Sequence, residues 1–189
     1  MREWINGATV IANAVLLLSA PSVSAELTRM HSGGVTFPVA VNFPTKPQEL
    51  SFPAPAALKK TMYHSFVAVD RGAMATYSVL VVSMDRSLGV ASRDVAQQMV
   101  DKSVATQTAL TDSALGVKSK VIESDKKPLS GYVARNVRLE RALPLKLYGR
   151  YQAVFVDRFL IVVWASGIDS DEQWLKTESF VNSLKIIQE

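Results

Sequence analysis

Two stretches of this sequence are apolar on both faces of a β-strand, and they constrain the fold more than any other feature. The second half of Ala73–Met84 is apolar at every position from Val79 to Val82, and Phe159–Ala165 is apolar throughout. A strand of this kind must be covered by other elements on both sides. The pattern therefore predicts central strands of a sheet that lies between two further layers.

Several other segments alternate between apolar and polar residues, which is typical of half-buried strands. They are Phe37–Phe43, Gln48–Phe52, Lys60–Asp70, Val117–Ser124, Tyr132–Leu143 and Lys146–Val156. Short turns separate many of them, and consecutive strands joined by tight turns are antiparallel. We expect Phe37–Phe43 and Gln48–Phe52 to form a hairpin around the prolines between them. Val117–Ser124 is the least apolar of the set, and we expect it at an edge of the sheet.

Two segments carry the helical pattern. Ser92 is a candidate N-cap for a helix over about Arg93–Leu110, whose apolar residues recur at helical spacing. Ser170 and Gln173 form a capping box at the start of a second helix. The buried stripe expected on that helix consists of Trp174, Thr177, Phe180, Val181 and Leu184.

The order of these elements predicts an α+β fold. It is an antiparallel sheet of about six to eight strands flanked by two amphipathic helices, because each helix must bury its apolar stripe on a face of the sheet. We expect residues 37–189 to form a single domain and residues 26–36 to be a flexible leader.

The first 25 residues have the pattern of a secretory signal peptide. The apolar stretch Ala8–Ala20 is too short to span a bilayer comfortably, and Pro21 ends it. Val23–Ala25 places small residues at the positions that a signal peptidase reads. We therefore expect cleavage after Ala25 and export, with the bacterial periplasm as the destination. An alternative is a leader that is retained as a peripheral membrane anchor.

Composition excludes several classes of function. The net charge is +4, but the basic residues are scattered and form no stripe, so nucleic acid is not an expected partner. The chain has no cysteine, so its stability depends on packing alone. No apolar segment after the leader is long enough to cross a membrane. A weak attraction to anionic lipid or peptidoglycan stays open.

One region resembles a known family. Residues 37–48, FPVAVNFPTKPQ, are similar to the opening F-x-V-x-F-P-x-K-P pattern of small exported proteins with the PsbP-like fold. Phe180–Leu184 is similar to the family's closing F-x-x-S-F/L, and the order of elements agrees over nearly all of the chain after the leader. Thr45 stands where the family usually has glycine. The PsbP-like fold is shared by the extrinsic PsbP protein of photosystem II and a Ran-binding nuclear import factor.

The resemblance implies an antiparallel sheet between helices, in an α/β/α sandwich. It also implies a non-enzymatic binding or assembly role. It carries over no site residue and no partner.

The sequence contains no recognisable catalytic, metal-binding or phosphate-binding motif. Two distant histidines, His31 and His64, do not make a zinc set without carboxylates. No serine lies in a nucleophile elbow, and no glycine-rich phosphate loop occurs. Asp169, Asp171 and Glu172 lack the spacing of a calcium loop, and the dipole of the second helix explains Asp171 and Glu172 in its first turn. We therefore expect no catalytic residue, no metal site and no cofactor.

The arginines and tyrosines of the C-terminal half are the candidate binding residues. A regular strand would place Arg135 and Arg141 on the same face as apolar residues, where a guanidinium must be paired, must reach the rim or can clamp an anion. Arg138 falls on the opposite face. Aromatic side chains beside arginine are typical of interfaces. The candidate surface or cleft consists of His64, Tyr132, Arg135, Arg138, Tyr148 and Arg150.

Two functions follow. The first is an exported binding or assembly module, with a protein partner in the cell envelope. The second is an envelope enzyme that acts on an anionic substrate, with His64 as the base and Arg135 as the anion clamp.

Overall fold

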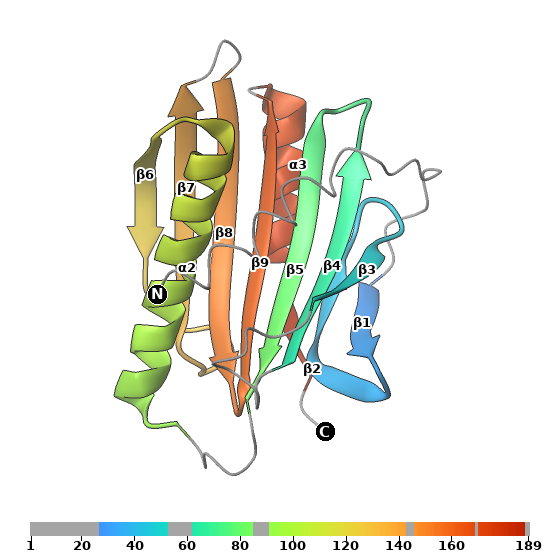
Figure 1. Ribbon diagram of the computed structural model, residues 1–189, viewed down its shortest axis with the longest axis vertical. Coiled ribbons are helices and arrows are strands. Elements are labelled where there is room, and N and C mark those ends of the chain that lie inside the picture. The colour runs from blue at the N-terminus through green and yellow to red at the C-terminus, as the bar shows by residue number, and fades with distance from the viewer. Residues whose placement is uncertain (1–26, 53–61, 85–90, 143–145, 169, 188–189) are drawn as a thin grey trace.

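A seven-stranded antiparallel sheet forms the middle layer of the computed structural model (Figure 1). The structure describes residues 27–52, 62–84, 91–142, 146–168 and 170–187. The strand order in the large sheet is β3-β4-β5-β9-β8-β7-β6, and a small sheet has the order β1-β2-β10. The elements are β1 (Leu27–Ser32), β2 (Val35–Asn42), β3 (Gln48–Phe52), β4 (Met62–Asp70), β5 (Ala75–Ser83), α2 (Arg93–Leu115), β6 (Ser119–Asp125), β7 (Ala134–Ala142), β8 (Lys146–Val156), β9 (Phe159–Ile168), α3 (Asp171–Asn182) and β10 (Lys185–Ile186).

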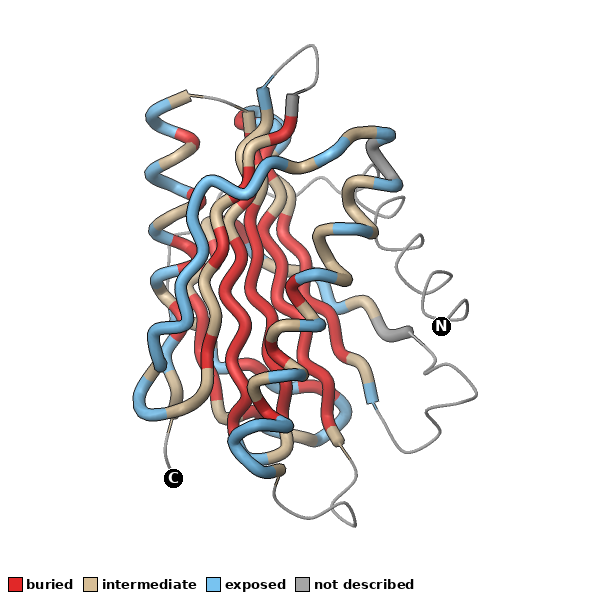
Figure 2. The backbone as a smooth tube through the Cα atoms, turned by 90° about the vertical axis from the view of Figure 1, so that its left-hand side faces the viewer, coloured by how far each residue is buried: buried red, intermediate tan, exposed pale blue. Residues whose placement is uncertain are grey.

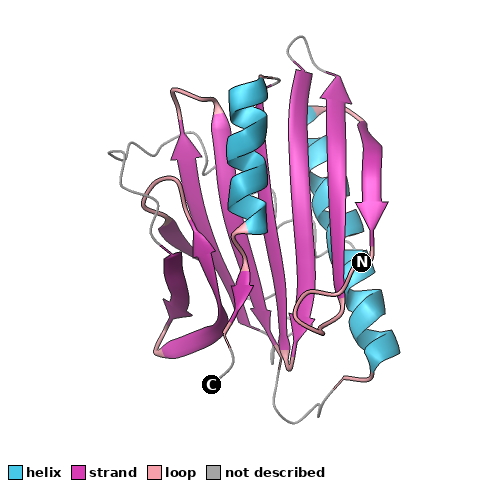
Figure 3. Cartoon of the chain, turned by 180° about the vertical axis from the view of Figure 1, so that it is seen from behind, coloured by secondary structure: helices cyan, strands magenta, loops and turns pink. Residues whose placement is uncertain are grey.

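The two faces of the large sheet are covered by different elements. Helix α2 packs on β7, β8 and β9 on one face, and α3 lies on β8 and β9 on the other (Figures 1 and 3). The small sheet covers β4 and β5 on the α3 side, where Phe37 and Val39 of β2 are fully buried. Each face therefore has its own hydrophobic core, and the α+β sandwich predicted from the sequence is confirmed.

The strands expected at the centre are at the centre. Strands β5 and β9 are neighbours in the middle of the sheet, and both are buried along most of their length (Figure 2). Val79 and Val81 enter the core on the α3 side, whereas Leu80 and Val82 enter the core on the α2 side. Strands β5 and β9, which have apolar residues on both faces, therefore connect the two cores.

The C-terminal half agrees with its sequence pattern. Strands β6, β7, β8 and β9 form an antiparallel meander, and β6 is at the edge. The predicted N-caps also form, because the hydroxyl of Ser92 accepts from the amide of Val95 and that of Ser170 accepts from the amide of Gln173. The predicted capping box is incomplete, because the amide of Ser170 donates to the carbonyl of Ile168 and not to the side chain of Gln173. Helix α2 runs past its predicted end to Leu115, and Gly116 closes it in the left-handed conformation, with φ 65°.

The N-terminal strands differ from the expected hairpin. Strand β2 does not pair with β3 but with β1 and with β10, at the other end of the described chain. Strand β3 pairs with β4 instead. Part of the segment expected as a flexible leader, residues 26–36, is β1, which is held in the small sheet by its ladder to β2. Local alternation identified the strands, but the pairing depends on partners far along the chain.

The expected signal peptide, residues 1–25, lies outside the described residues. Within the part of the chain that the structure describes, neither helix is long and apolar enough to cross a membrane.

Candidate functional site

The face of the sheet beside α3 is only partly covered. Helix α3 packs on β9 and β8, whereas β7 and β6 extend beyond it (Figure 3). The register between β7 and β8 places Arg138 opposite Arg150 and Glu140 opposite Tyr148. Cross-strand partners share a face. Three of the residues that the sequence singled out, Arg138, Tyr148 and Arg150, therefore lie together.

Trp174, in the first turns of α3, joins these residues. The guanidinium carbon of Arg138 lies 4.2 Å from the centroid of the indole ring. The ring of Tyr148 meets the indole edge to face, with 5.3 Å between centroids and 71° between planes. We call Arg138, Tyr148, Arg150 and Trp174 the Trp174 cluster. All four are partly exposed, so the cluster forms a stacked surface of rings and guanidinium groups.

The two arginines of the cluster would repel each other without counter-charges, because like charges opposite each other destabilise a sheet. Each has its own carboxylate. Arg138 pairs with Glu123 of β6 at 2.9 Å, and Arg150 pairs with Glu178 of α3 at 2.5 Å. Arg150 also donates to the side-chain oxygen of Asn182 at 3.2 Å. These bonds fix both guanidinium groups and leave the cluster close to neutral.

Sequence reasoning missed Trp174 as a surface residue. It expected Trp174 in the buried stripe of the second helix, but the buried residues of α3 are Gln173, Thr177, Phe180 and Val181. The stripe is rotated toward Gln173, which leaves Trp174 at the boundary between the helix and the open part of the sheet. A polar residue at a buried helix position gives no signal in the pattern of apolar residues.

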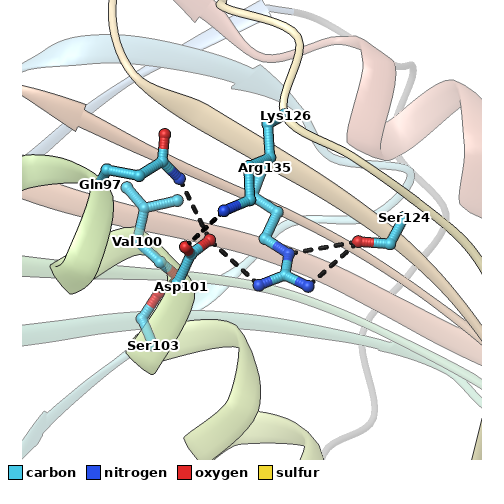
Figure 4. Close-up of polar contacts among 7 residues, drawn as sticks. All are labelled: Gln97, Val100, Asp101, Ser103, Ser124, Lys126 and Arg135. Carbon is cyan, nitrogen blue, oxygen red and sulfur yellow. Dashed lines mark hydrogen bonds and ion pairs between the residues drawn. The ribbon is translucent and has the colours of Figure 1, made fainter.

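Arg135 lies on the other side of the sheet. Its guanidinium donates to the carboxylate of Asp101 on α2 at 3.0 Å and to the hydroxyl of Ser124 at 3.1 and 3.2 Å (Figure 4). Lys126 reaches the same carboxylate at 2.8 Å. The side chain of Arg135 is 28% exposed, so it reaches the rim, paired. Figure 4 shows a cross-link between α2 and the β6–β7 hairpin rather than an open anion clamp.

The charge of Asp101 depends on these contacts. Burial alone would raise the pKa of its carboxyl group, but hydrogen bonds from Lys126, Arg135 and Gln97 outweigh it and lower the pKa below its usual value. The carboxylate is thereby kept ionised and occupied by its own cations.

Tyr132 is remote from the Trp174 cluster. It follows the turn after β6, where its backbone pairs with Leu129, and it packs against the core on the α3 side. It lines a shallow hollow of about 380 Å³ together with Thr36, Pro38, Val156, Asp157, Phe159 and Ile187. Tyr132 therefore belongs to a different surface from Tyr148.

His64, on β4, is buried on the α3 side of the sheet. Only 5% of the residue is exposed, and its ring centroid lies 5.0 Å from that of Phe37. Its Nδ1 is 2.8 Å from the hydroxyl of Ser32 on β1, and that hydroxyl donates to the carboxylate of Glu49 on β3. The three side chains tie the small sheet to the edge of the large one.

This order of groups is not that of a nucleophile activated by a base. In a catalytic triad the imidazole lies between the hydroxyl and the carboxylate, so that it can take the hydroxyl proton. Here the serine lies in the middle and its hydroxyl donates to Glu49. Burial lowers the pKa of His64, with Glu49 acting in the opposite direction. His64 and Ser32 are both buried, so this geometry gives the enzymatic alternative no support.

A shallow hollow lies on the outer side of Glu49. Its volume is about 440 Å³, and its lining residues are Thr28, Arg29, Met30, His31, Phe43, Thr45, Lys46, Pro47, Glu49 and Phe66. His64 and Ser32 are not in its lining. Among the described residues, no group of three or more histidine, aspartate and glutamate side chains could hold a metal ion.

Arg141 is the least expected side chain of the β7 strand. It is fully buried on the α2 side, where its Nε donates to Asp112 of α2 at 3.1 Å and its Nη2 donates to the hydroxyl of Tyr151 at 3.0 Å. Asp112 also accepts from the amide and the hydroxyl of Ser119. From the sequence we expected a buried Arg141 to be paired, and its partner in the structure is the carboxylate of Asp112. The network anchors the end of α2 to the sheet.

Comparison with family models found no match, and comparison with curated proteins found none either. The fold is similar to that of several solved structures. One is the cyanobacterial PsbP protein CyanoP from Synechocystis sp. PCC 6803, with 12% identity over 90% of this chain and 98% of that chain and a TM-score of 0.47. Another is LpqN from Mycobacterium tuberculosis, which is described as involved in cell envelope biogenesis, with 11% identity over 88% and 93% of the two chains and a TM-score of 0.40. A Pseudomonas aeruginosa protein of unknown function has 13% identity over 80% and 88% of the two chains and a TM-score of 0.38. At these values the likeness concerns the fold and carries nothing about activity or partner.

Proposed function

We propose that this chain is an exported, non-enzymatic binding or assembly module that contacts a protein partner of the cell envelope through the Trp174 cluster. The observation that carries the proposal is the stacking of Arg138 and Tyr148 on Trp174 at a part of the sheet that α3 leaves open. Tryptophan, tyrosine and arginine are the residues that most often dominate the binding energy of protein interfaces.

The arrangement of the cluster also favours binding over chemistry. Its two guanidinium groups are fixed by Glu123 and Glu178, so they lose little side-chain freedom when a partner docks. The ion pairs leave no strong net charge, which suits a partner that places an apolar or aromatic side chain on the indole ring rather than a phosphate. The paired carboxylates at the border supply a polar rim.

The binding proposal is tested by variants of the cluster. Trp174→Ala and Arg138→Ala are expressed with a C-terminal tag in the native host, and proteins cross-linked to the chain in the periplasm are identified by mass spectrometry. The interaction is then measured with the purified partner. We expect either variant to weaken binding by about tenfold or more.

Leu175→Ala is the matched control. Leu175 is 64% exposed on the same helix but belongs to neither the cluster nor a core, so its loss should leave binding unchanged. Thermal unfolding of all variants shows that they are folded. If the partner bound the Trp174→Ala variant with the same affinity as the native chain, the proposed surface would be wrong.

Export is tested separately. The N-terminal sequence of the protein purified from the periplasmic fraction should begin at Glu26, since Val23–Ala25 is the proposed cleavage site. A cytoplasmic protein that starts at Met1 would refute export without bearing on the binding surface.

A further inference from the structure

Strand β6 is an exposed edge of the large sheet. Among the residues that the structure describes, it is the last strand in the order and pairs only with β7, and every residue of the strand after Ser119 is exposed. Figure 2 views the molecule onto this edge, where β6 runs in front as a pale blue strand. Val121 and Ile122 in its middle are 56% and 46% exposed. An edge of this kind has a free row of backbone donors and acceptors, which invites pairing with another strand.

The charges along β6 are complementary to those of a second β6 strand that lies antiparallel to it. Lys118 and Lys120 lie before Val121, and Glu123 and Asp125 lie after Ile122. If two copies of the strand pair antiparallel around a two-fold axis between Val121 and Ile122, each lysine meets a carboxylate. The resulting pairs are Lys118 with Asp125, Ser119 with Ser124, Lys120 with Glu123, and Val121 with Ile122.

A β-bulge makes this register consistent with the faces of the sheet. Residues three apart on a regular strand point to opposite faces. Here the register shifts between Val121 and Glu123, so that Lys120 lies opposite Glu140 and Glu123 lies opposite Arg138. Because Glu140 and Arg138 are two residues apart on β7, Lys120 and Glu123 share the α3 face. A two-fold axis perpendicular to the sheet keeps each face on its own side, so Lys120 meets Glu123 of the second copy.

We propose that β6 pairs antiparallel with β6 of a second copy of this chain, in the register that places Lys120 opposite Glu123, and forms a weak, concentration-dependent dimer with one continuous sheet. Cross-strand pairs of opposite charge and the two central Val121–Ile122 contacts stabilise it. The inference does not rest on the proposed function, but the two share Glu123, which also pairs with Arg138 of the Trp174 cluster. The proposed dimer places the Trp174 clusters of the two copies on the same face of the joined sheet.

The test uses complementary charge reversals. Molar mass is measured by sedimentation equilibrium on the native chain between about 1 μM and about 500 μM. Lys120→Glu places two carboxylates opposite Glu123 residues, and Glu123→Lys places two lysines opposite Lys120 residues. We expect each variant alone to dimerise about tenfold more weakly than the native chain. An equimolar mixture of the two variants should regain native affinity, since every cross-strand pair is then of opposite charge.

Lys102→Glu, at an exposed site on α2, is the matched control for the change in net charge and should dimerise like the native chain. A second measurement uses the absence of cysteine from the sequence. Ile122→Cys lies beside the proposed axis and should form a disulfide-linked dimer on mild oxidation. Ser179→Cys, exposed on α3, should not.

Three results would overturn the proposal. The first is a native chain that stays monomeric over the whole range. The second is a dimer that neither reversal weakens, which would place the contact elsewhere. The third is an equimolar mixture of the two reversal variants that dimerises as weakly as each variant alone.

Discussion

At the scale of single residues, the clearest dependence is that of Arg141 on Gly149. An ideal Cβ built at Gly149 would lie 2.8 Å from Nη1 of Arg141 and 3.3 Å from the ring of Tyr151. The guanidinium cannot move away easily, because it is fully buried and bonded to Asp112 and Tyr151. The strand thus has glycine where another side chain approaches its backbone.

Gly149→Ala is therefore expected to lower the free energy of unfolding by about 1 to 3 kcal/mol. In the background of Arg141→Met, where a flexible apolar side chain replaces the guanidinium, the same change should cost less. Urea unfolding of the two single variants and the double variant measures this coupling. Strictly additive effects would show that Arg141 does not set the requirement for glycine.

His64 makes the stability depend on pH. Burial lowers the pKa of His64 in the folded state, so the neutral imidazole is favoured there. Its contribution is fully present above the ordinary histidine pKa of 6.5 and is lost as the pH falls toward the lower folded pKa. We expect the native chain to lose more stability than His64→Asn between about pH 7.5 and about pH 5. Denaturant unfolding at several pH values checks this, and identical profiles would contradict it.

At the scale of elements, the orientation of α3 matters most, because this helix carries Trp174. Its start is fixed by Ser170, whose hydroxyl accepts from the amide of Gln173 at 3.2 Å. Ser170→Ala removes this cap and should reduce stability by about 1 kcal/mol. Ser179→Ala, at an exposed site on the same helix, should change it by less than about 0.5 kcal/mol. Equal effects of the two substitutions in thermal unfolding would show that the cap contributes nothing.

The helices and strands were largely predictable from the sequence. The pairing of a strand was predictable only where a short turn joins it to its neighbour. The Asp157–Arg158 turn joins β8 to β9 with adjacent ends, and such pairings follow from a short connection. Strand β2 has the alternation of a strand, but its neighbours are β1 and the distant β10. Nothing in the local pattern of β2 identifies those partners, so the proline turn after it suggested the wrong hairpin.

The candidate site was predictable to a similar degree. Arg138, Tyr148 and Arg150 were identified as binding candidates by residue type, and the pairing of β7 with β8 brings them together. Their partners Trp174 and Glu178 come from a separate element, whose placement depends on how α3 packs. Arg135, Tyr132 and His64 were candidates for the same site, but Arg135 and Tyr132 lie on other surfaces and His64 is buried. Residue type alone does not determine the face or the end of a strand.

At the scale of the whole molecule, the two cores share their central strands. Phe37 lies in the α3-side core, in contact with the rings of His64, Phe66 and Phe159, and it is fully buried. Strands β5 and β9 contribute residues to both cores. Loss of packing on one side should therefore destabilise the other side as well.

Phe37→Ala is expected to cost about 3 to 5 kcal/mol, and unfolding should remain a single transition. Tryptophan fluorescence and far-UV circular dichroism should give coincident curves, since Trp164 lies in the α2-side core and Trp174 lies on the α3 side. Phe155→Ala, in that second core, is the matched comparison and should also shift both signals together. Two separated transitions in either variant would show that the cores unfold independently.

The ladder between β2 and β10 has a consequence for the time course of folding. Val39 and Ala40 are among the first described residues to leave the ribosome, yet the backbone groups with which they pair belong to Ile186 and Lys185. During synthesis this side of β2 lacks its β10 partner until Lys185 and Ile186 have been made. The small sheet therefore closes only after all the other described strands have been synthesised, which keeps this part of the nascent polypeptide open for longer than in a fold built from successive hairpins.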